Sequence, residues 1–524
     1  MIRTNKPHIP HLQHLDVSRT PSRAIANRPV FRPRLTPKRR ADELERPDLL
    51  PPKELMDEKL GSEAQTVLDV LKRGRHKVYL VGSWVREAIR NPKKIPKKVL
   101  VATNARPRRI IKLFQRVADV EVDDRWAKYG NVNIIASTGK IISVSTIRKD
   151  GPTKDHRHPQ NVTFTDNIVD HLGRVDFTCD AIAYDPFTGQ FIDPFEGSKD
   201  IRRKRIKTVG DPKQRFTEDP FRCLRGICLA AELGFEIVPG VKDAIRESLS
   251  FLLDLSAERR RDALLRILQI QSVSRAFNVL VETGTLHVFS KHFHEAIGVV
   301  QGTGHEFKVL QHLVLTCEYL PTSDPILRLA GLLHDIGKPK TIHYNPKTKS
   351  ETFPGHEKVG ADMAQRIMRD LKFGKKDIER VDRLVRHHKF AFGQNWTDKR
   401  LRFFILNVGE ENIQDLILLR RADHRAHRNY PPDEEVPCPE MDQLQERILK
   451  LILEEGPPSK ISVALRGEDI MEILNYKQSE RDIGRAQHLL RDRVLENPQI
   501  NNRTDLRRIL LEHFTPLPDE PESN

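Results

Sequence analysis

The pattern of hydrophobic and polar residues changes along the 524-residue chain. Residues 1–58 are rich in Pro, Arg and His and show no apolar periodicity, which predicts a disordered basic arm. Residues 59–200 mix short apolar runs, typical of strands, with helical periodicity, and from Pro212 the helical period continues almost to the end. The pattern therefore predicts an α+β protein, with a mixed-sheet head, an all-helical remainder and a disordered end at 516–524.

Several strands are expected in the head. An apolar strand at Val78–Val81 runs into a turn and a short helix, and a second strand ends at Thr103. Two alternating runs, Gly130–Ser137 and Lys140–Ile147, predict a pair of neighbouring strands, and a short strand is expected within Gln190–Gly197.

The first long helix after the head is expected to follow Thr217, because a threonine hydroxyl is a good N-cap. Leu224, Ile227, Ala231 and Leu233 would then form its apolar face.

Composition narrows the possible partners. The length predicts three or four domains, and no apolar run approaches the roughly 18 residues that cross a bilayer, so no membrane partner is expected. The mean hydropathy is −0.54, charged residues make up 31% of the chain, and the net charge is +16 with a pI of about 9.5. This charge favours a polyanionic partner such as RNA or DNA over the alternative that Lys and Arg are only solvated surface.

The five cysteines are odd in number and scattered. Cys223 and Cys228 fall on one predicted helix with no second pair, so reduced core thiols are a better interpretation than a zinc site. We therefore expect a cytoplasmic protein.

Several motifs follow one another along the chain, which are YLVGSWVREAI, VATNARPRRIIKLF, VDFTCDAIAYD, TEDPFRCLRG, SAERRRDALLRIL, LLHDIGKP, FPGHEKVGADMA and LRGEDIMEIL. Together they resemble the tRNA nucleotidyltransferase and bacterial poly(A) polymerase family with an appended HD domain. The likeness covers roughly residues 60–512. It implies a nucleotidyltransferase-like head at 59–200, a helical neck and body at 201–300, an HD domain at 301–430 and a helical tail at 431–515.

The resemblance also implies a site for ATP or CTP. Asp219 and Arg222 are three residues apart, so on a helix they would share a face, and a carboxylate beside a guanidinium can pair with a nucleobase edge. An ordinary surface ion pair is the alternative. Ser83 and Asp180 depart from the family pattern and are expected to weaken nucleotide binding. The implied nucleotide-binding residues are Gly82, Arg86, Asp176, Asp219, Arg222 and Arg225.

The metal-binding acids of the family polymerase site are missing. Their positions match Lys98, Leu100 and Ser143, which cannot hold Mg²⁺ as carboxylates do. We therefore expect an inactive polymerase site. The alternative is an active site with acids recruited from another strand, where the candidates are Asp119, Glu121, Asp123 and Asp124.

The HD motifs, in contrast, are filled in order. His and Asp ligands drawn from several helices suit Mg, Mn, Ni, Fe or Co, and an ion held there would support hydrolysis of a phosphate ester. His334 and Asp335 would then be catalytic, and the His387-His388 pair could complete a second site. The implied metal ligands are His312, His334, Asp335, His356 and Asp423.

Two basic runs, Asn91–Lys98 and Ile201–Lys207, are dense enough to contact RNA phosphates. The candidate RNA-binding residues are Lys93, Lys94, Arg202, Arg203, Lys204 and Arg205.

Three functions remain open from the sequence. One is an RNA-binding protein of RNA 3′-end processing, with tRNA or RNA 3′ ends as partner, a silent polymerase site and an HD phosphohydrolase. The second is an active CCA-adding or poly(A)-adding enzyme. The third is an RNA-binding scaffold without catalysis. The sequence does not identify the metal, the HD substrate or the oligomeric state.

Overall fold

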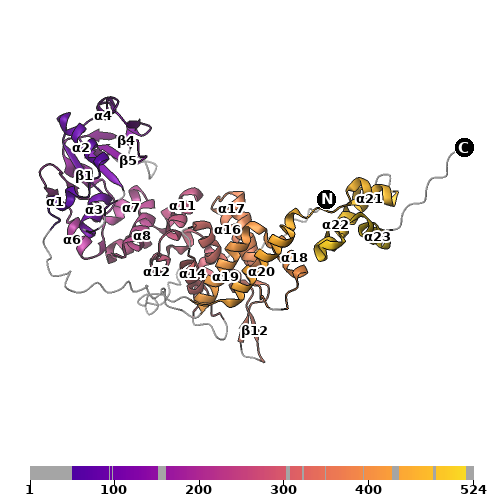
Figure 1. The fold of residues 1–524 in the computed structure, drawn as a ribbon. Coiled ribbons are helices and arrows are strands. Elements are labelled where there is room, and N and C mark those ends of the chain that lie inside the picture. The colour runs from indigo at the N-terminus through magenta and orange to yellow at the C-terminus, as the bar shows by residue number, and fades with distance from the viewer. Residues whose placement is uncertain are drawn as a thin grey trace, which may run out of the picture.

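The computed structural model describes residues 50–91, 93, 95–96, 98–151, 161–301, 307–321, 324–347, 350–393, 395–427, 436–475 and 480–514. In Figure 1 the head stands at one end of an elongated molecule, helices between residues 212 and 455 form the body, and a small group of helices between 467 and 513 lies at the other end. The predicted disordered ends lie outside the described residues, except for 50–58. Disorder was wrong there, because Lys53–Asp57 form helix α1 and Met56 is fully buried in the main core.

The head is built on a mixed seven-stranded sheet with the order β3-β4-β5-β2-β1-β8-β9. Strands β2 and β5 pair in parallel, and the other neighbours pair antiparallel, including β4 with β5 as the sequence pattern predicted. The strands are β1 Val78–Val81, β2 Val99–Thr103, β3 Val120–Asp123, β4 Asn131–Ala136, β5 Ile141–Thr146, β8 Ala183–Tyr184 and β9 Phe191–Ile192, with a separate pair of β6 Arg148–Asp150 and β7 Val162–Phe164.

Alternation along β4 and β5 gives this sheet two different faces. Val132, Ile134, Ile142 and Val144 are almost completely buried in the core that they share with α2 and α4, whereas the residues between them project from the other face. That second face carries the candidate nucleotide site. The helices of the head are α2 Ser62–Arg73, α3 Ser83–Arg90, α4 Pro107–Phe114, α5 Ile168–Gly173 and α6 Gly197–Arg202, with the short 3₁₀ turn η2 at Ala127–Tyr129.

The neck confirms the predicted apolar helix face but corrects its start. Leu224, Ile227 and Ala231 are buried in α8. Thr217, however, lies inside the preceding helix and donates to the Lys213 carbonyl instead of capping α8. Pro220 explains the break, because the residue before a proline is pushed out of the helical region. The neck elements are α7 Pro212–Glu218, α8 Phe221–Leu233, α9 Pro239–Glu247, α10 Leu249–Leu253, α11 Ala257–Leu268, α12 Val273–Glu282 and α13 Lys291–Glu295, with β10 Arg205–Ile206 paired to β11 Glu236–Ile237.

The rest of the body continues the same apolar core, whereas the three helices at the far end share a separate one. No helix in the described part of the chain is long and apolar enough to span a membrane. The body helices are α14 Val309–Tyr319, α15 Pro325–Leu333, α16 His356–Asp370, α17 Lys375–His387, α18 Asp398–Val408, α19 Ile413–His427 and α20 Pro439–Glu455, with a hairpin of β12 His343–Asn345 and β13 Ser350–Thr352. The terminal helices are α21 Gly467–Leu474, α22 Glu480–Glu496 and α23 Arg503–His513.

Candidate functional sites

The cross-strand register places two of the missing-acid positions in one row across the head sheet. Leu100 is opposite Ser143, Ser143 is opposite Asn133, and Asn133 is opposite Asp123. Ser143 Oγ donates to Asn133 Oδ1 at 2.8 Å, and Asn133 Nδ2 donates to Asp123 Oδ2 at 3.2 Å. Residues in register lie on the same face, so the row has its one carboxylate at the end farthest from Leu100.

The Asp123 carboxylate forms an ion pair with Arg125. Arg125 Nε lies 2.8 Å from Asp123 Oδ1, and hydrogen bonds from Arg125 and Asn133 hold the pKa of Asp123 well below its usual range.

At the other end of the row, Leu100 packs against the turn after β1. Gly82 has φ 67° and ψ −139°, a backbone conformation that needs glycine. A Cβ atom there would lie 3.0 Å from Leu100 Cδ1, so the leucine side chain fills the space beside the turn. Lys98, at the third missing-acid position, is exposed.

Arg86 and Asp180 form a pair at this site. Arg86 is buried and its Nη1 donates to Asp180 Oδ1 at 2.5 Å, while its Nε donates to Glu87 at 3.2 Å. Burial raises the pKa of Asp180, and the Arg86 charge opposes this rise. The unexpected carboxylate is therefore compensated inside the protein, by a guanidinium that was expected to bind nucleotide.

The expectation that Asp219 and Arg222 share one helix face was wrong, and so was the alternative of an ion pair between their side chains. Asp219 has extended geometry at the end of α7, because it precedes Pro220, so the two residues are not on one helix. Asp219 instead contacts Arg225 at 2.5 Å and Arg259 at 2.9 Å.

Arg222 turns toward a different acid. Its Nε lies 2.8 Å from Asp176, which also lies 3.1 Å from Arg225. Arg259 lies within the SAERRRD motif and was not expected at the site, but its guanidinium covers the Phe221 ring at 4.5 Å. The carboxylates and guanidiniums expected to read a nucleobase thus pair with one another.

The candidate RNA-binding residues lie in two places. Lys93 is exposed, and Lys94 lies outside the described residues. Arg203, Lys204 and Arg205 are exposed and Arg202 is half-buried at the turn between α6 and β10, where Lys204 has φ 52°. This turn projects three charged side chains together.

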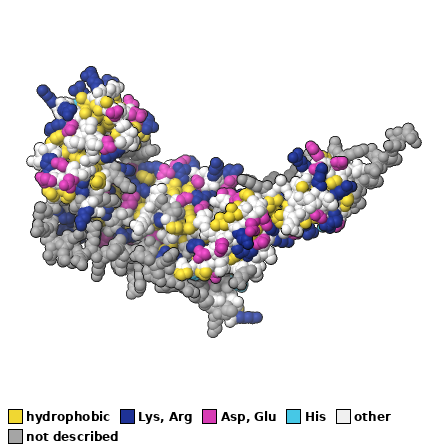
Figure 2. All heavy atoms as spheres, viewed as in Figure 1, with side chains coloured by type: hydrophobic (Ala, Val, Ile, Leu, Met, Phe, Trp, Pro, Cys, Tyr) yellow, Lys and Arg dark blue, Asp and Glu magenta, His cyan; other side chains and the backbone are white. Residues whose placement is uncertain are grey.

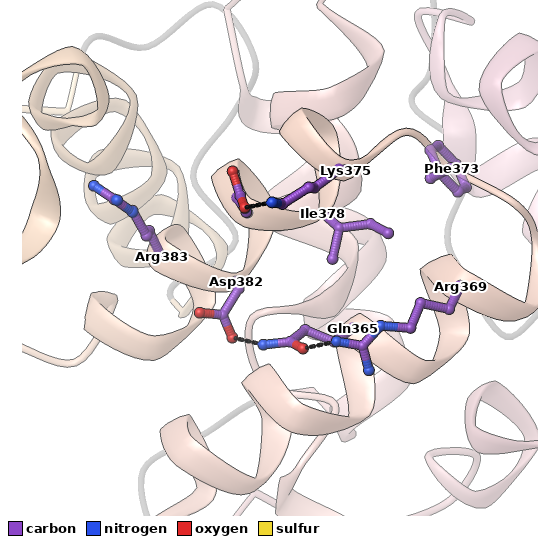
Figure 3. Close-up of a pocket in the computed structure, with 8 residues that line it drawn as sticks. Gln365, Arg369, Phe373, Lys375, Ile378, Asp382 and Arg383 are labelled. Atoms are coloured by element: carbon purple, nitrogen blue, oxygen red, sulfur yellow. Dashed lines mark hydrogen bonds and ion pairs between the residues drawn. The ribbon is translucent and has the colours of Figure 1, made fainter.

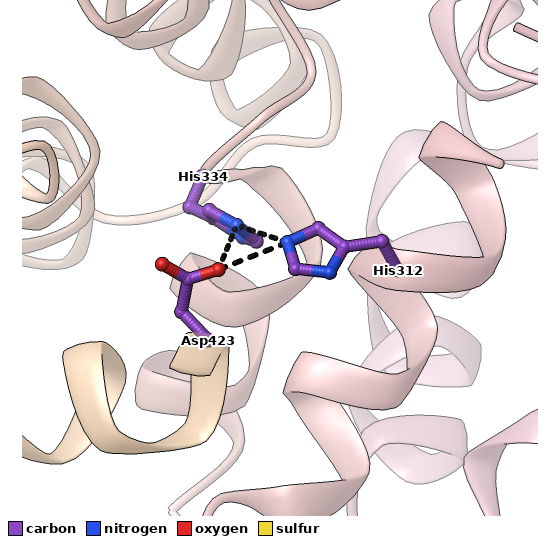
Figure 4. A group of neighbouring side chains, drawn as sticks. All are labelled: His312, His334 and Asp423. Atoms are coloured by element: carbon purple, nitrogen blue, oxygen red, sulfur yellow. Dashed lines mark hydrogen bonds and ion pairs between the residues drawn. The ribbon is translucent and has the colours of Figure 1, made fainter. Parts of the chain in front are cut away.

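In the body, His312, His334 and Asp423 converge from three helices, as Figure 4 shows. His312 Nε2 lies 3.0 Å from both His334 Nε2 and Asp423 Oδ1. Asp335 Oδ2 lies 3.3 Å from His334 Nε2 and 3.5 Å from His312 Nε2. Ligand atoms in cis positions around an octahedral ion with bonds of about 2.1 Å are about 3.0 Å apart, so these spacings suit one ion.

A second group forms on the other oxygen of Asp335. His356 Nε2 lies 3.1 Å and His388 Nε2 lies 3.3 Å from Asp335 Oδ1. The six side chains of the two groups are all buried. Asp335 therefore lies between two potential ion positions, and the sequence-predicted ligands come together with His388 added, whereas His387 belongs to neither group.

The histidine tautomers fit metal binding. Nδ1 of His334, His356 and His388 lies 2.7–2.8 Å from the carbonyl oxygens of Gly331, Phe353 and Val385, respectively. These contacts require the proton on Nδ1 and leave a lone pair on Nε2, the arrangement usual for metal-binding histidines. Lone pairs then face the oxygens of Asp335, and Oδ1 of Asp335 has no hydrogen-bond donor within the described part of the chain. A cation between these atoms would resolve the repulsion, so the donor set fits a divalent ion.

The carboxylates around His334 also favour its protonated form. Burial opposes protonation of His334, but Asp335 and Asp423 outweigh it and raise the pKa of His334 to about 10. Burial would raise the pKa values of both aspartates. His334 and Lys338 hold the pKa of Asp335 well below its usual range, and His312, His334 and His427 do the same for Asp423.

Three further side chains contact the cluster and were missed from sequence. Lys338 Nζ lies 2.6 Å from Asp335 Oδ2, Arg420 lies 2.6 Å from Asp423 Oδ2, and His427 lies 3.2 Å from Asp423 Oδ1. The sequence offered one signal for these contacts. Each of the three side chains is three or four residues from Asp335 or Asp423, a spacing that places two side chains on the same face of a helix.

A separate pocket lies between α16 and α17 (Figure 3). Its polar side chains pair with one another, for example Gln365 with Asp382 at 2.8 Å, and none of the HD ligands lines it. It is therefore not part of the candidate metal site.

Three family models match the chain. The poly A polymerase head domain matches residues 78–207, the probable RNA and SrmB-binding site of polymerase A matches 234–297, and the HD domain matches 303–427.

Individual relatives and solved structures agree. The A-adding tRNA nucleotidyltransferase of Deinococcus radiodurans is 31% identical over 329 residues, which are 60% of this chain and 73% of that protein. The CCA-adding enzyme of Geobacillus stearothermophilus is 35% identical over 222 residues, 42% of this chain, and the match spans only about half of that enzyme (53%). The crystal structure of the Bacillus stearothermophilus CCA-adding enzyme in complex with CTP has a TM-score of 0.62 at 23% identity and covers 86% of this chain and 96% of that one, which is a likeness of fold.

Proposed function

Because the chain belongs to the tRNA nucleotidyltransferase and poly(A) polymerase family with an appended HD domain, we propose that it binds tRNA or other RNA 3′ ends and hydrolyses a phosphate ester in its HD domain, while its polymerase site is silent. The observation that carries this proposal is the convergence of buried ligands on both oxygens of Asp335.

Each ligand of the HD site has a defined role in this proposal. His312, His334 and Asp423 would hold one divalent ion, His356 and His388 a second, and Asp335 both. A bound divalent ion supplies positive charge to a phosphate ester and acidifies water. Lys338, which is buried against Asp335, would keep that carboxylate ionised and oriented.

The geometry of the head supports a silent polymerase site. Asp123 is three strands away from Leu100, which at the usual strand spacing is about 14 Å. Two-metal phosphoryl transfer needs ions about 4 Å apart, held by shared carboxylates. Asp123 is on the correct face but too distant to replace an acid at Leu100, and it is paired with Arg125. This argues against the alternative of relocated acids.

The Asp335→Ala variant tests the HD proposal. Removing the shared ligand should abolish hydrolysis of a 2′,3′-cyclic nucleotide, lower the metal content and lower the melting temperature together, because bound metal stabilises the folded state. Elemental analysis of protein purified without chelator, thermal melts with added Mn²⁺, Ni²⁺ or Co²⁺, and phosphate-ester assays measure the three effects.

Lys98→Ala is the matched control and should leave all three unchanged, because Lys98 is exposed in the head. A wild-type protein that takes up no metal would overturn the proposal in favour of a non-catalytic scaffold. A protein that binds metal without hydrolysing phosphomonoesters or cyclic phosphates would overturn the hydrolase part alone.

A further inference from the structure

Of the three tryptophans, Trp126 alone is exposed to solvent. Trp84 and Trp396 are 0% and 5% exposed, whereas Trp126 is 55% exposed. The Trp126 ring lies 6.2 Å from that of Tyr129 with 32° between the planes, and Lys128 Nζ lies 4.8 Å above the Tyr129 ring. The turn η2 therefore presents an aromatic surface to solvent beside a positive charge.

Helix α4 lies next to this turn and is rich in basic residues. Its buried residues, Ile110 and Phe114, face the sheet, and the helix contains no acidic residue. Figure 2 shows Lys and Arg side chains projecting from the end of the head where Figure 1 places α4. Within the described ranges, no carboxylate lies at ion-pair distance from four exposed cations of this segment, which are Arg108, Arg109, Lys112 and Arg116.

The strand beside α4 directs two carboxylates away from this surface. Val120 and Val122 pack against the core that α4 covers, so the alternating residues Glu121 and Asp123 lie on the opposite face of β3. The tryptophan and the cations of α4 thus form a patch separate from the nucleotide face of the head.

We propose that Trp126 and α4 form a binding surface for single-stranded RNA. A base would stack on the exposed indole, and Arg108, Arg109 and Lys112 would contact the neighbouring phosphates. The eight residues of α4 extend for about 12 Å, which is long enough to follow a short length of backbone. The charge of the patch favours a polyanion over an apolar protein partner, and the stacking ring favours unpaired bases over a duplex.

Tryptophan fluorescence of the full-length protein provides a direct test, because the other two indoles are buried. Single-stranded oligoadenylate should quench the emission in a saturable way. Fluorescence anisotropy of the labelled oligonucleotide measures the affinity. Trp126→Ala should weaken this affinity about 5- to 150-fold, the usual range for loss of one stacked base. Trp126→Phe should lose the quenching but keep most of the affinity.

Two further variants separate stacking from charge. Arg108→Ala with Arg109→Ala should make the slope of log affinity against log salt shallower by about 0.7 for each phosphate that is no longer neutralised. Leu453→Ala, at an 84% exposed leucine on α20, is the control and should bind as wild type. Emission that does not change at saturating RNA, wild-type affinity of Trp126→Ala, or equal quenching by a duplex would each overturn the proposal. Arg203→Ala with Arg205→Ala tests the basic turn between α6 and β10 separately. If this variant binds RNA as wild type does, the conclusion about Trp126 is unaffected.

Discussion

His171 is a buried titratable side chain outside both candidate sites. It is 4% exposed in α5, and its Nδ1 has no hydrogen-bond partner among the described residues. Burial, reinforced by Arg174 and Arg148, lowers the pKa of His171 to about 3. The folded head therefore contains a neutral histidine that an unfolded chain would protonate near pH 6.5.

This histidine should make the protein sensitive to acid. Because its pKa is lower in the folded state, its contribution is complete above about pH 6.5 and is lost progressively as the pH falls toward 3. In urea titrations, the midpoint of His171→Leu should fall less than that of wild type between about pH 6.5 and 4. His343→Leu, at an exposed histidine, should follow wild type. Parallel curves for His171→Leu and wild type would contradict the assignment.

Arg402 of α18 joins three helices of the body and the terminal group. This buried residue of α18 donates to both oxygens of Glu455, at the end of α20, at 2.7 and 2.6 Å. Its Nη1 also donates to the carbonyl oxygens of Leu495 and Glu496, at the end of α22, at 3.3 Å each. A cation at a helix C-terminus satisfies carbonyl groups that the helix leaves free. One guanidinium therefore holds the terminal helices, which have their own core, to the body.

Arg402→Ala should loosen this junction. The loss of several charge-assisted hydrogen bonds should destabilise docking of the terminal helices by about 2–4 kcal/mol. Amide exchange in α22 should accelerate accordingly, while exchange in α14 should not change. Lys399→Ala provides the comparison on the same helix, because its exposed pair with Glu496 is worth at most about 1 kcal/mol. Equal exchange in both variants would show that apolar contacts alone hold the junction.

The two candidate sites lie in different parts of the fold. The row through Ser143 lies in the head, whereas the cluster around Asp335 lies in the body (Figure 1). Loss of nucleotide transfer in the head therefore does not require loss of phosphate-ester hydrolysis in the HD domain. Family models match both the head and the HD domain. The two differ in whether the residues that could bind metal ions are present at the site.

A primer-extension assay examines the head independently of the HD domain. With a tRNA that lacks its CCA end, ATP, CTP and Mg²⁺ or Mn²⁺, we expect no added nucleotides, because Lys98, Leu100 and Ser143 provide no carboxylate for the ions. Asp335→Ala should bind the same tRNA as wild type does. Extension that disappears in Asp123→Asn would instead demonstrate a relocated metal site.

Local patterns were sufficient for much of the fold. Alternating residues in β4 and β5 identified a strand pair, because one face of a half-buried strand must be apolar. The order of the HD motifs likewise identified five of the six buried side chains that cluster around Asp335 and could hold a metal ion. These features depend on neighbouring residues and on side-chain type, both of which are visible in a sequence.

Partners distant in the chain were decided by the tertiary structure. Asp219 was expected to share a helix face with Arg222. Its carboxylate instead contacts Arg225 and Arg259, because Pro220 breaks the helix and α11 packs beside α8. The sequence determined which side chains carry charge and which segments form helices or strands. Packing decided which charges meet, because an ion pair needs atoms within about 4 Å and only the assembled core brings distant segments that close.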